Sequence, residues 1–213
     1  MKLEDTADML VKLVVCGESG VGKTNLIYRY IQDRFEFNSK STIGIEFYSK
    51  RIIWNKLKVD LQVFDTVGQE KYRSVSNSFF KMSQGVLLVY DVTQLQSFEK
   101  LTFWKQFISQ NTKPSIPVLL IGNKIDLASG RRVTTEKGSE FGKENGFYFL
   151  ETSAKTNQND CVSKAFELIF NQMCLAAHEE LRILDNEIKE LSGKALRIDV
   201  GNEDVGANKR CCI

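Results

Sequence analysis

Residues Gly17-Glu18-Ser19-Gly20-Val21-Gly22-Lys23-Thr24 decide the fold. They match the spacing GxxxxGK[ST], in which glycines let the chain curl so that backbone N–H groups point inward. An apolar run, Val11 to Val15, precedes them, and a helical pattern from Lys23 to Gln32 follows. Because a helix begins directly after the loop, its N-terminal N–H groups add to a nest for phosphate oxygens. The sequence therefore predicts a phosphate-binding loop between a strand and a helix.

Two side chains of this loop have predicted chemical roles. Lys23 would reach the outer phosphates of a nucleotide, and Thr24 would ligate Mg²⁺. The motif alone does not distinguish ATP from GTP. The predicted nucleotide contacts in this segment are Ser19, Gly20, Val21, Gly22, Lys23, Thr24 and Asn25.

A second element, Asp65-Thr66-Val67-Gly68-Gln69, follows the apolar run Leu57 to Phe64. At the end of a strand the Asp65 carboxylate can hold a metal ion through water, while the Gly68 N–H faces the terminal phosphate. Taken alone, the spacing DxxG is more often a plain turn. Its place after the phosphate loop makes it a second part of a nucleotide site.

Asn123-Lys124-Ile125-Asp126 closes the apolar run Pro117 to Ile121, and guanine explains this choice of residues. The Asp126 carboxylate can accept from both the ring N1–H and the exocyclic amine of guanine, whereas adenine offers no such pair of donors on one edge. Asn123 would tie the loop and contact the base, and the Lys124 stem would cover the ring. The sequence therefore predicts GTP and GDP as ligands.

A last polar segment, Ser153-Ala154-Lys155, follows the predicted strand Phe147 to Glu151. Its Ala154 N–H would donate to the guanine oxygen, and all three residues are predicted nucleotide contacts.

The alternation of strand and helix patterns predicts an α/β fold with a mostly parallel sheet and helices on both faces. A further run, Ile45 to Trp54, is joined to Leu57–Asp65 by only Asn55-Lys56, which permits only an antiparallel pair. One antiparallel edge strand is therefore expected. Further helices are predicted over Gln96 to Gln110, over Thr134 to Asn145 and from Gln158 onward.

Composition and charge exclude several classes of protein. The 29 Lys and Arg against 27 Asp and Glu give a net charge of +2, too little to steer the chain onto nucleic acid. The acidic start, with Glu4, Asp5 and Asp8, and the lack of any apolar run near 18 residues predict neither secretion nor a membrane span.

The predicted organisation is an N-terminal extension (1–10), a nucleotide-binding domain (11–177), an extension of the last helix (178–192) and a flexible tail (193–213). Within the extension, Leu181, Leu184, Ile188 and Leu191 continue an apolar 3-4-3 spacing. An overlong helix with an apolar stripe is the simpler interpretation. A coiled-coil or effector seam is the alternative, with fewer than two heptads to support it.

In this order, over residues 11–175, the phosphate loop, the Thr42 segment, DxxGQ, NKxD and SAK resemble the Ras-like small GTPases. Ile43-Gly44-Ile45-Glu46-Phe47 resembles the IGVDF segment of Rab proteins, and Gln69-Glu70-Lys71-Tyr72-Arg73 resembles their QERYR or QERFR. Cys211-Cys212-Ile213 resembles a Rab end. The resemblance implies a P-loop GTPase domain with a six-stranded sheet. It also implies a vesicle-trafficking switch that recruits effectors when GTP-bound and hydrolyses GTP to GDP and phosphate.

The resemblance assigns three more residues. Thr42 matches the first-switch Mg²⁺ ligand whose N–H contacts the terminal phosphate, so the implied metal ligands are Thr24, Thr42 and Asp65. Phe35 matches the aromatic residue that packs against guanine. Gln69 matches the residue that orients the attacking water, with Lys23 and Thr42 as the other catalytic groups.

The sequence also departs from the Rab pattern. Where Rab proteins have WDTAGQ, this chain has Phe64 in place of Trp and Val67 in place of Ala. Phe47, Phe64 and Phe79 still supply an aromatic triad. The β-branched Val67 could restrict the switch where water must be placed. A hydrolysis-impaired, GTP-bound scaffold is therefore the alternative function. Lys81-Met82-Ser83-Gln84 also differs from the usual YRGA.

The implied partners are an exchange factor, a GTPase-activating protein, effectors, and a GDP dissociation inhibitor or escort protein. We expect no nucleic-acid partner, and we expect the chain to be a monomer. Cys211 and Cys212 are predicted to be geranylgeranylated, placing the protein on the cytoplasmic face of an endomembrane and cycling it with cytosol. A CaaX box would need Cys where Arg210 stands. Two inert exposed thiols are the alternative.

Overall fold

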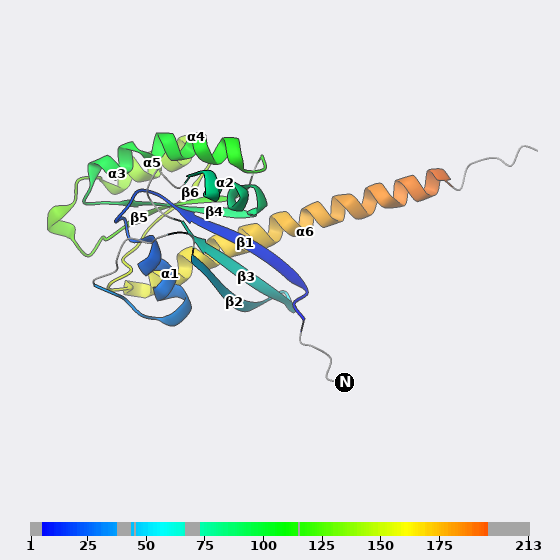
Figure 1. Ribbon diagram of the computed structural model, residues 1–213, viewed down its shortest axis with the longest axis horizontal. Coiled ribbons are helices and arrows are strands. Elements are labelled where there is room, and N and C mark those ends of the chain that lie inside the picture. The colour runs from blue at the N-terminus through cyan, green and yellow to red at the C-terminus, as the bar shows by residue number, and fades with distance from the viewer. Residues whose placement is uncertain (1–5, 38–43, 45, 67–72, 115, 196–213) are drawn as a thin grey trace, which may run out of the picture. The chain divides into compact units, whose positions relative to one another are not determined.

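The computed structural model describes residues 6–37, 44, 46–66, 73–114 and 116–195 of the 213-residue chain. Within these residues six strands form one sheet in the order β2-β3-β1-β4-β5-β6 (Figure 1). The strands are β1 (Met9–Cys16), β2 (Glu46–Trp54), β3 (Leu57–Asp65), β4 (Gly85–Asp91), β5 (Val118–Asn123) and β6 (Tyr148–Glu151). All neighbours pair in parallel except β2 and β3, which pair antiparallel at one edge. This sheet confirms the predicted fold.

The burial of each strand follows its place in the sheet. The central strands β4 and β5 are buried at every residue, which explains why their sequences read as continuous apolar runs. The edge strand β2 has no fully buried residue. Its hairpin to β3 turns at Asn55 and Lys56, whose φ angles of 46° and 71° are typical of a two-residue hairpin turn.

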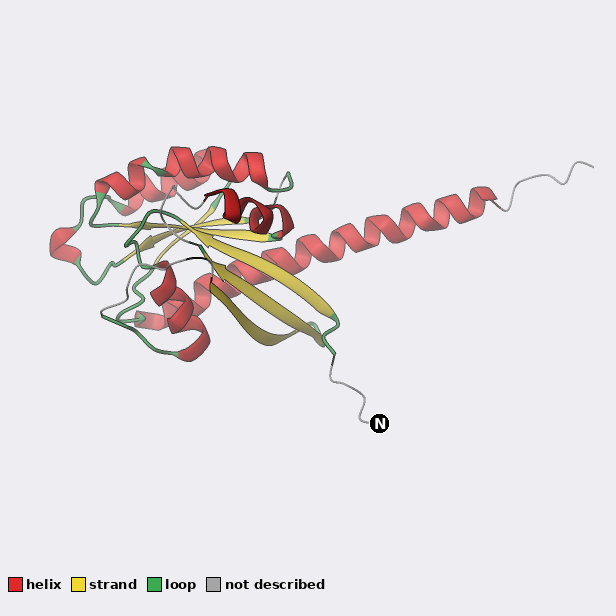
Figure 2. Ribbon diagram, in the orientation of Figure 1, coloured by secondary structure: helices red, strands yellow, loops and turns green. Residues whose placement is uncertain are grey.

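The described residues contain six α-helices. Within the unit Met1–Ala177, helices cover both faces of the sheet (Figure 2). The six helices are α1 (Lys23–Gln32), α2 (Arg73–Met82), α3 (Leu95–Glu99), α4 (Leu101–Asn111), α5 (Thr135–Asn145) and α6 (Cys161–Ala195). Side chains alternate along β1, so Leu13 packs in one hydrophobic cluster with α1 and the start of α6. Val14 packs in a second cluster with α2 and α4. The core therefore has two layers, one on each face.

The helices differ from the sequence predictions in four places. The stretch Gln96 to Gln110 forms two helices, α3 and α4, which meet at Lys100. The helix expected from Gln158 starts as a 3₁₀ turn, since Asn159 has a φ of 53°, and α6 begins at Cys161. Helix α6 continues to Ala195, past the predicted end at 192. Gly193 does not end it, because a single glycine inside a helix costs only about 1 kcal/mol. Helix α2 was not predicted.

Backbone contacts divide the chain into two units, Met1–Ala177 and His178–Ile213. In the first unit the carboxyl ends of the parallel strands lie at one edge of the sheet, which is where ligands bind in open α/β sheets. None of the described helices combines the length and the apolar character needed to cross a membrane.

Candidate nucleotide-binding site

The loop between β1 and α1 is shaped by glycines. Gly17 has a φ of 137°, and a Cβ added there would lie 2.1 Å from the carbonyl oxygen of Val89. Gly22 has a φ of 98°, and a Cβ there would lie 2.5 Å from Nδ2 of Asn123. A side chain at either position would collide with β4 or with Asn123 at the end of β5, so both positions require glycine.

Helix α1, which the structure describes in full, begins without a side-chain cap. Gly22 is its N-cap, and its first turn contains no acidic residue. The positive end of the helix dipole therefore faces the loop with no carboxylate of its own first turn to balance it. A phosphate group fits this position.

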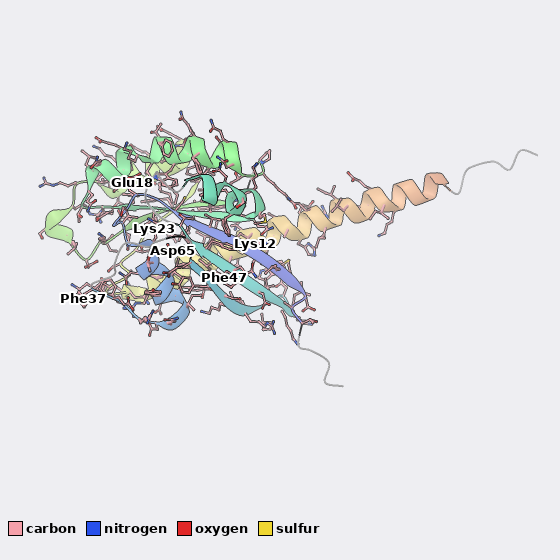
Figure 3. The ribbon with its side chains drawn as sticks, viewed as in Figure 1. Lys12, Glu18, Lys23, Phe37, Phe47 and Asp65 are labelled. Carbon is pink, nitrogen blue, oxygen red and sulfur yellow. The ribbon has the colours of Figure 1, made fainter. Side chains whose placement is uncertain are left out.

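Lys23 lies inside the curl of the loop. Its side chain is buried, and Nζ donates to the carbonyl oxygens of Gly17 at 3.0 Å and Glu18 at 2.8 Å. Figure 3 labels Lys23 together with Glu18 and Asp65. Burial lowers the pKa of Lys23, and the nearby Asp65 carboxylate is the largest influence that opposes this shift. Two backbone carbonyl oxygens already hold the Lys23 ammonium group in place. Phosphate oxygens would give this buried cation anionic partners. Lys23 is therefore suited to bind phosphate.

Asp65, buried at the end of β3, lies next to the first turn of α1. Its Oδ2 accepts a hydrogen bond from Thr24 Oγ1 at 2.5 Å. A carboxylate and a hydroxyl are oxygen ligands that Mg²⁺ accepts, usually together with waters and substrate phosphates. Among the described residues no group of three or more His, Cys, Asp or Glu side chains gathers. The donor set therefore fits a metal site that phosphates complete, rather than an all-protein cage.

Asn123, at the end of β5, joins three segments of the chain. Its Nδ2 donates to the carbonyl oxygen of Val21 at 2.9 Å, which lies in the phosphate loop. Its Oδ1 accepts from the Ala154 N–H and from Thr152 Oγ1, each at 3.3 Å. One buried amide thus fixes the loops after β1, β5 and β6 to one another.

Lys124 adds a second link between the same loops. Its Nζ donates to the carbonyl oxygen of Gly20 at 2.7 Å and lies 2.7 Å from Oδ2 of Asp91. Asp91 is buried at the end of β4, and its Oδ1 accepts from the Thr93 N–H at 2.8 Å. Asp91 was not among the predicted site residues, yet it anchors the lysine that the sequence singled out.

The carboxylate of Asp126 is oriented by the loop after β6. Ser153 Oγ donates to Asp126 Oδ1 at 2.6 Å and accepts from the Thr156 N–H at 3.1 Å. Asp126 itself is half-buried. A carboxylate held in this way can accept two N–H groups from one ligand edge, as guanine presents them.

Two further contacts around the site were missed by the sequence analysis. Arg29 of α1 donates from Nε to the carbonyl oxygen of Ala154 at 2.9 Å. Trp104 of α4 donates from Nε1 to Oε1 of Glu18, in the phosphate loop, at 3.1 Å. No local pattern marks either residue, because the partners lie 125 and 86 positions away in the chain.

The segment after α1 is anchored by Asn25, whose side chain exchanges two hydrogen bonds with the backbone of Glu36, at 3.0 and 2.8 Å. Phe35 packs beside the core and meets the ring of Phe37 edge to face, with centroids 5.0 Å apart. Lys155 Nζ lies 5.4 Å from the centre of the Phe37 ring. Several predicted residues lie outside the described part of the chain: Thr42, Val67, Gly68, Gln69, Cys211 and Cys212.

The aromatic triad predicted from the sequence is confirmed, and the structure places its rings on β2, β3 and α2. The ring centroids of Phe47 and Phe64 lie 5.6 Å apart, and those of Phe64 and Phe79 lie 4.9 Å apart. Phe64 is buried, whereas Phe47 is 53% exposed. The Phe64 ring, which stands where the Rab pattern has Trp, therefore contacts both other rings of the triad.

A glycine-shaped loop with a buried lysine, tied to a second loop by Asn123 and Lys124, defines a P-loop nucleotide-binding protein. The sequence model of the Ras family matches residues 12–175. The chain is 35% identical over 213 residues to the GTP-binding protein ypt3 of Schizosaccharomyces pombe, covering 98% of this chain and 99% of that protein. It is 37% identical over 213 residues to the Ras-related protein RABA1c of Arabidopsis thaliana, covering 99% and 97%. It is 36% identical over 214 residues to the Ras-related protein Rab11B of Nicotiana tabacum, also covering 99% and 97%.

The chain belongs to the Ras family of small GTPases, in its Rab branch. It is a GTP-binding protein and a GTPase, and it acts as a guanine-nucleotide switch in vesicle trafficking.

Proposed function

We propose that the loops described above bind GTP and GDP together with Mg²⁺, and that Asp126 selects guanine. The observation that supports this most is the pair of hydrogen bonds from Asn123 and Lys124 to the carbonyl oxygens of Val21 and Gly20, at 2.9 and 2.7 Å. They join the base-reading loop to the phosphate loop. A nucleotide bound by both loops would be held at its two ends by one rigid assembly.

The proposed roles divide between phosphate, metal and base. Backbone N–H groups of the phosphate loop, the Lys23 ammonium and the Gly68 N–H hold the phosphates. Thr24, Thr42 and Asp65 hold the metal, and Mg²⁺, when bound, neutralises charge on the phosphates. On the base side, Phe35 and the stem of Lys124 pack against the ring, the Ala154 N–H donates to the guanine oxygen, and Ser153 orients Asp126.

Hydrolysis needs no nucleophilic side chain in this proposal. Gln69 orients the attacking water, and Lys23 and Thr42 hold the terminal phosphate in place. No arginine of the chain is assigned to the transferred phosphate, so a GTPase-activating protein is expected to supply one. In related switches such an arginine adds roughly 10³ to 10⁵ to the rate.

In the cell the proposed cycle involves an exchange factor, a GTPase-activating protein and effectors that contact the switch segments. A GDP dissociation inhibitor or escort protein would carry the monomeric, lipid-modified chain between the cytosol and the cytoplasmic face of an endomembrane. Geranylgeranyl groups on Cys211 and Cys212 are the proposed anchor.

Single-turnover hydrolysis of preloaded GTP tests the proposal, with and without a broadly acting GTPase-activating protein. The wild-type protein should hydrolyse GTP slowly alone and at least about a thousandfold faster with the activating protein. The variant Gln69→Leu should bind GTP as tightly but hydrolyse it far more slowly. GTP that stays intact under both conditions in the wild-type protein would contradict a hydrolytic switch.

A second variant separates the effect of Val67 from that of Gln69. If the extra bulk of Val67 hinders the switch, Val67→Ala should raise the intrinsic rate while nucleotide affinity stays the same. An unchanged rate would remove this hypothesis and leave the assignment of Gln69 untouched.

A further inference from the structure

The described part of α6 beyond Ala177 presents an apolar stripe that the nucleotide site does not use. Leu181, Leu184 and Ile188 follow one another at spacings of three and four residues, which places them on one face of the helix. Their side chains are 57%, 52% and 61% exposed. Large apolar side chains grouped in this way mark an interaction surface rather than an ordinary solvated helix face.

The spacing of the stripe is that of a heptad. Leu181 and Ile188 take successive a positions, and Leu184 takes the d position between them. By sequence Leu191 takes the next d position, although its side chain lies outside the described ones. The apolar side chains of the stripe thus extend over nearly two heptads, along which one partner helix can pack. This length supports weak, reversible pairing.

One edge of the stripe is acidic. Glu180 and Glu187 take the two g positions, next to the a residues that follow them. Across residues 178–195 the helix contains five acidic residues against three basic ones, a difference of −2. The acidic residues are Glu179, Glu180, Asp185, Glu187 and Glu190, and the basic ones are Arg182, Lys189 and Lys194. A facing helix with Lys or Arg along this edge would therefore meet complementary charge.

The same charges disfavour two other partners for the apolar stripe, namely a second copy of this chain and an anionic membrane. In an antiparallel pair of identical helices, g positions face g positions, so Glu180 would meet Glu187 of the second copy. In a parallel pair, g positions face e positions, so Glu180 would meet position 185, an aspartate. An anionic membrane surface attracts Lys and Arg and would repel this segment.

We propose that the face formed by Leu181, Leu184 and Ile188, edged by Glu180 and Glu187, docks an amphipathic helix of another protein that carries Lys or Arg along its facing edge. The pairing is of the coiled-coil type, with apolar side chains in the seam and opposite charges beside it. None of these residues is assigned to the nucleotide site. The docking is therefore expected to have equal affinity in the GDP-bound and GTP-bound protein.

Fluorescence anisotropy of labelled three-heptad peptides with the full chain tests the proposal. All peptides have Ile at a and Leu at d, and they differ only in having Lys, Gln or Glu at e and g. The Lys peptide should bind most tightly and the Glu peptide most weakly, by about tenfold or more. The double change Glu180→Lys and Glu187→Lys should reverse this order.

Ile183 provides a matched control. It is 50% exposed on the same helix, but at 3.6 residues per turn it points about 130° away from the stripe. Leu184→Ser with Ile188→Ser should weaken binding of the Lys peptide about tenfold or more, whereas Ile183→Ser should leave it unchanged. Equal binding of the three peptides, or equal losses in the two variants, would refute the proposal.

Two more measurements decide between occupants. Sedimentation velocity should show the unmodified chain to be monomeric at the concentrations used for peptide binding. A dimer that Leu184→Ser abolishes would make a second copy the occupant. Flotation with phosphatidylserine-rich vesicles should show no binding of the unlipidated chain, and binding lost in Leu184→Ser would assign the face to a membrane. Either result would overturn the proposal.

Discussion

Arg29 and Ala154 lie 125 positions apart in the chain, yet Arg29 Nε donates to the carbonyl oxygen of Ala154 at 2.9 Å. Its Nη2 donates to the carbonyl oxygen of Lys155 at 3.2 Å, and its Nη1 donates to the backbone and side chain of Asp33. One side chain thus ties the end of α1 to the loop after β6. Because α1 starts at the phosphate loop, Arg29 connects the two ends of the proposed nucleotide site.

Replacing Arg29 with Ala should speed the release of bound GDP, because the Ala154 peptide loses its tether. A hydrogen bond to a charged group contributes about 1.5–3 kcal/mol, so release should accelerate about tenfold or more. Stopped-flow release of a fluorescent GDP analogue measures this. As a control, Arg182→Ala removes only an exposed ion pair with Glu179 and should leave release unchanged. Unaltered release in Arg29→Ala would show that the contact does not hold the base loop.

Replacing Asp126 with Asn should weaken GTP binding, because one acceptor for the guanine donors becomes a donor. Xanthosine triphosphate has a carbonyl where guanine has an amine, so its affinity should rise in the variant. The expected loss for GTP is at least about tenfold, from one hydrogen bond to a charged group. Competition binding with both nucleotides measures the exchange of preference. Equal affinity of the unmodified protein for ATP and GTP would end the assignment of Asp126.

The sheet could be predicted from the sequence because its signals are local. The continuous apolar runs of β4 and β5 follow from burial on both faces, and the two-residue link at Asn55 and Lys56 leaves only an antiparallel pair. Helix α2 was not predicted, although it begins at Arg73, the last residue of the motif Gln69 to Arg73. The break at Lys100 was missed because the residues on both sides of it continue one helical pattern.

The site was predicted only as far as its motifs reach. Each motif places polar residues near the carboxyl end of a strand: Lys23 comes after β1, Asp65 ends β3, and Asn123 and Asp126 lie at and just after the end of β5. The residues that position the motif side chains lie on other elements. Asp91, at the end of β4, holds Lys124, which follows β5. Arg29 and Trp104 contact partners far away in the chain, so no pattern within a window of sequence reveals them.

Cys16 and Cys174 should resist alkylation in the native protein. Both are buried; burial raises the pKa of Cys174 to about 12 and raises the pKa of Cys16 as well. Only the thiolate reacts, so at mildly alkaline pH both thiols stay protonated as well as shielded. Maleimide labelling followed by peptide mass spectrometry should modify them only after unfolding, with half-buried Cys161 as the comparison. Rapid native labelling of Cys16 would contradict its burial in the second hydrophobic cluster.

The proposed lipid anchor rests on two neighbouring thiols and on the charge of the segment before them. A disulfide between adjacent cysteines is strained, and a zinc site would need more ligands than the single histidine of the chain, His178, provides. Residues 178–213 contain eight acidic and six basic residues, so electrostatic attraction to an anionic membrane cannot assist a single lipid. Stable attachment therefore needs two chains, each contributing about 0.8 kcal/mol per buried CH₂ group.

Changing both Cys211 and Cys212 to Ser should leave nucleotide binding unaffected and move the protein wholly to the soluble fraction of its own cells. Each single change should give intermediate retention, because one chain gives only marginal and reversible attachment. Cell fractionation measures the distribution, and GDP binding by the same variants serves as the control for folding. A double variant that still pellets with membranes would show that another part of the chain supplies the attachment. Unmodified thiols at both positions in the native protein, seen by mass spectrometry, would likewise remove the lipid assignment.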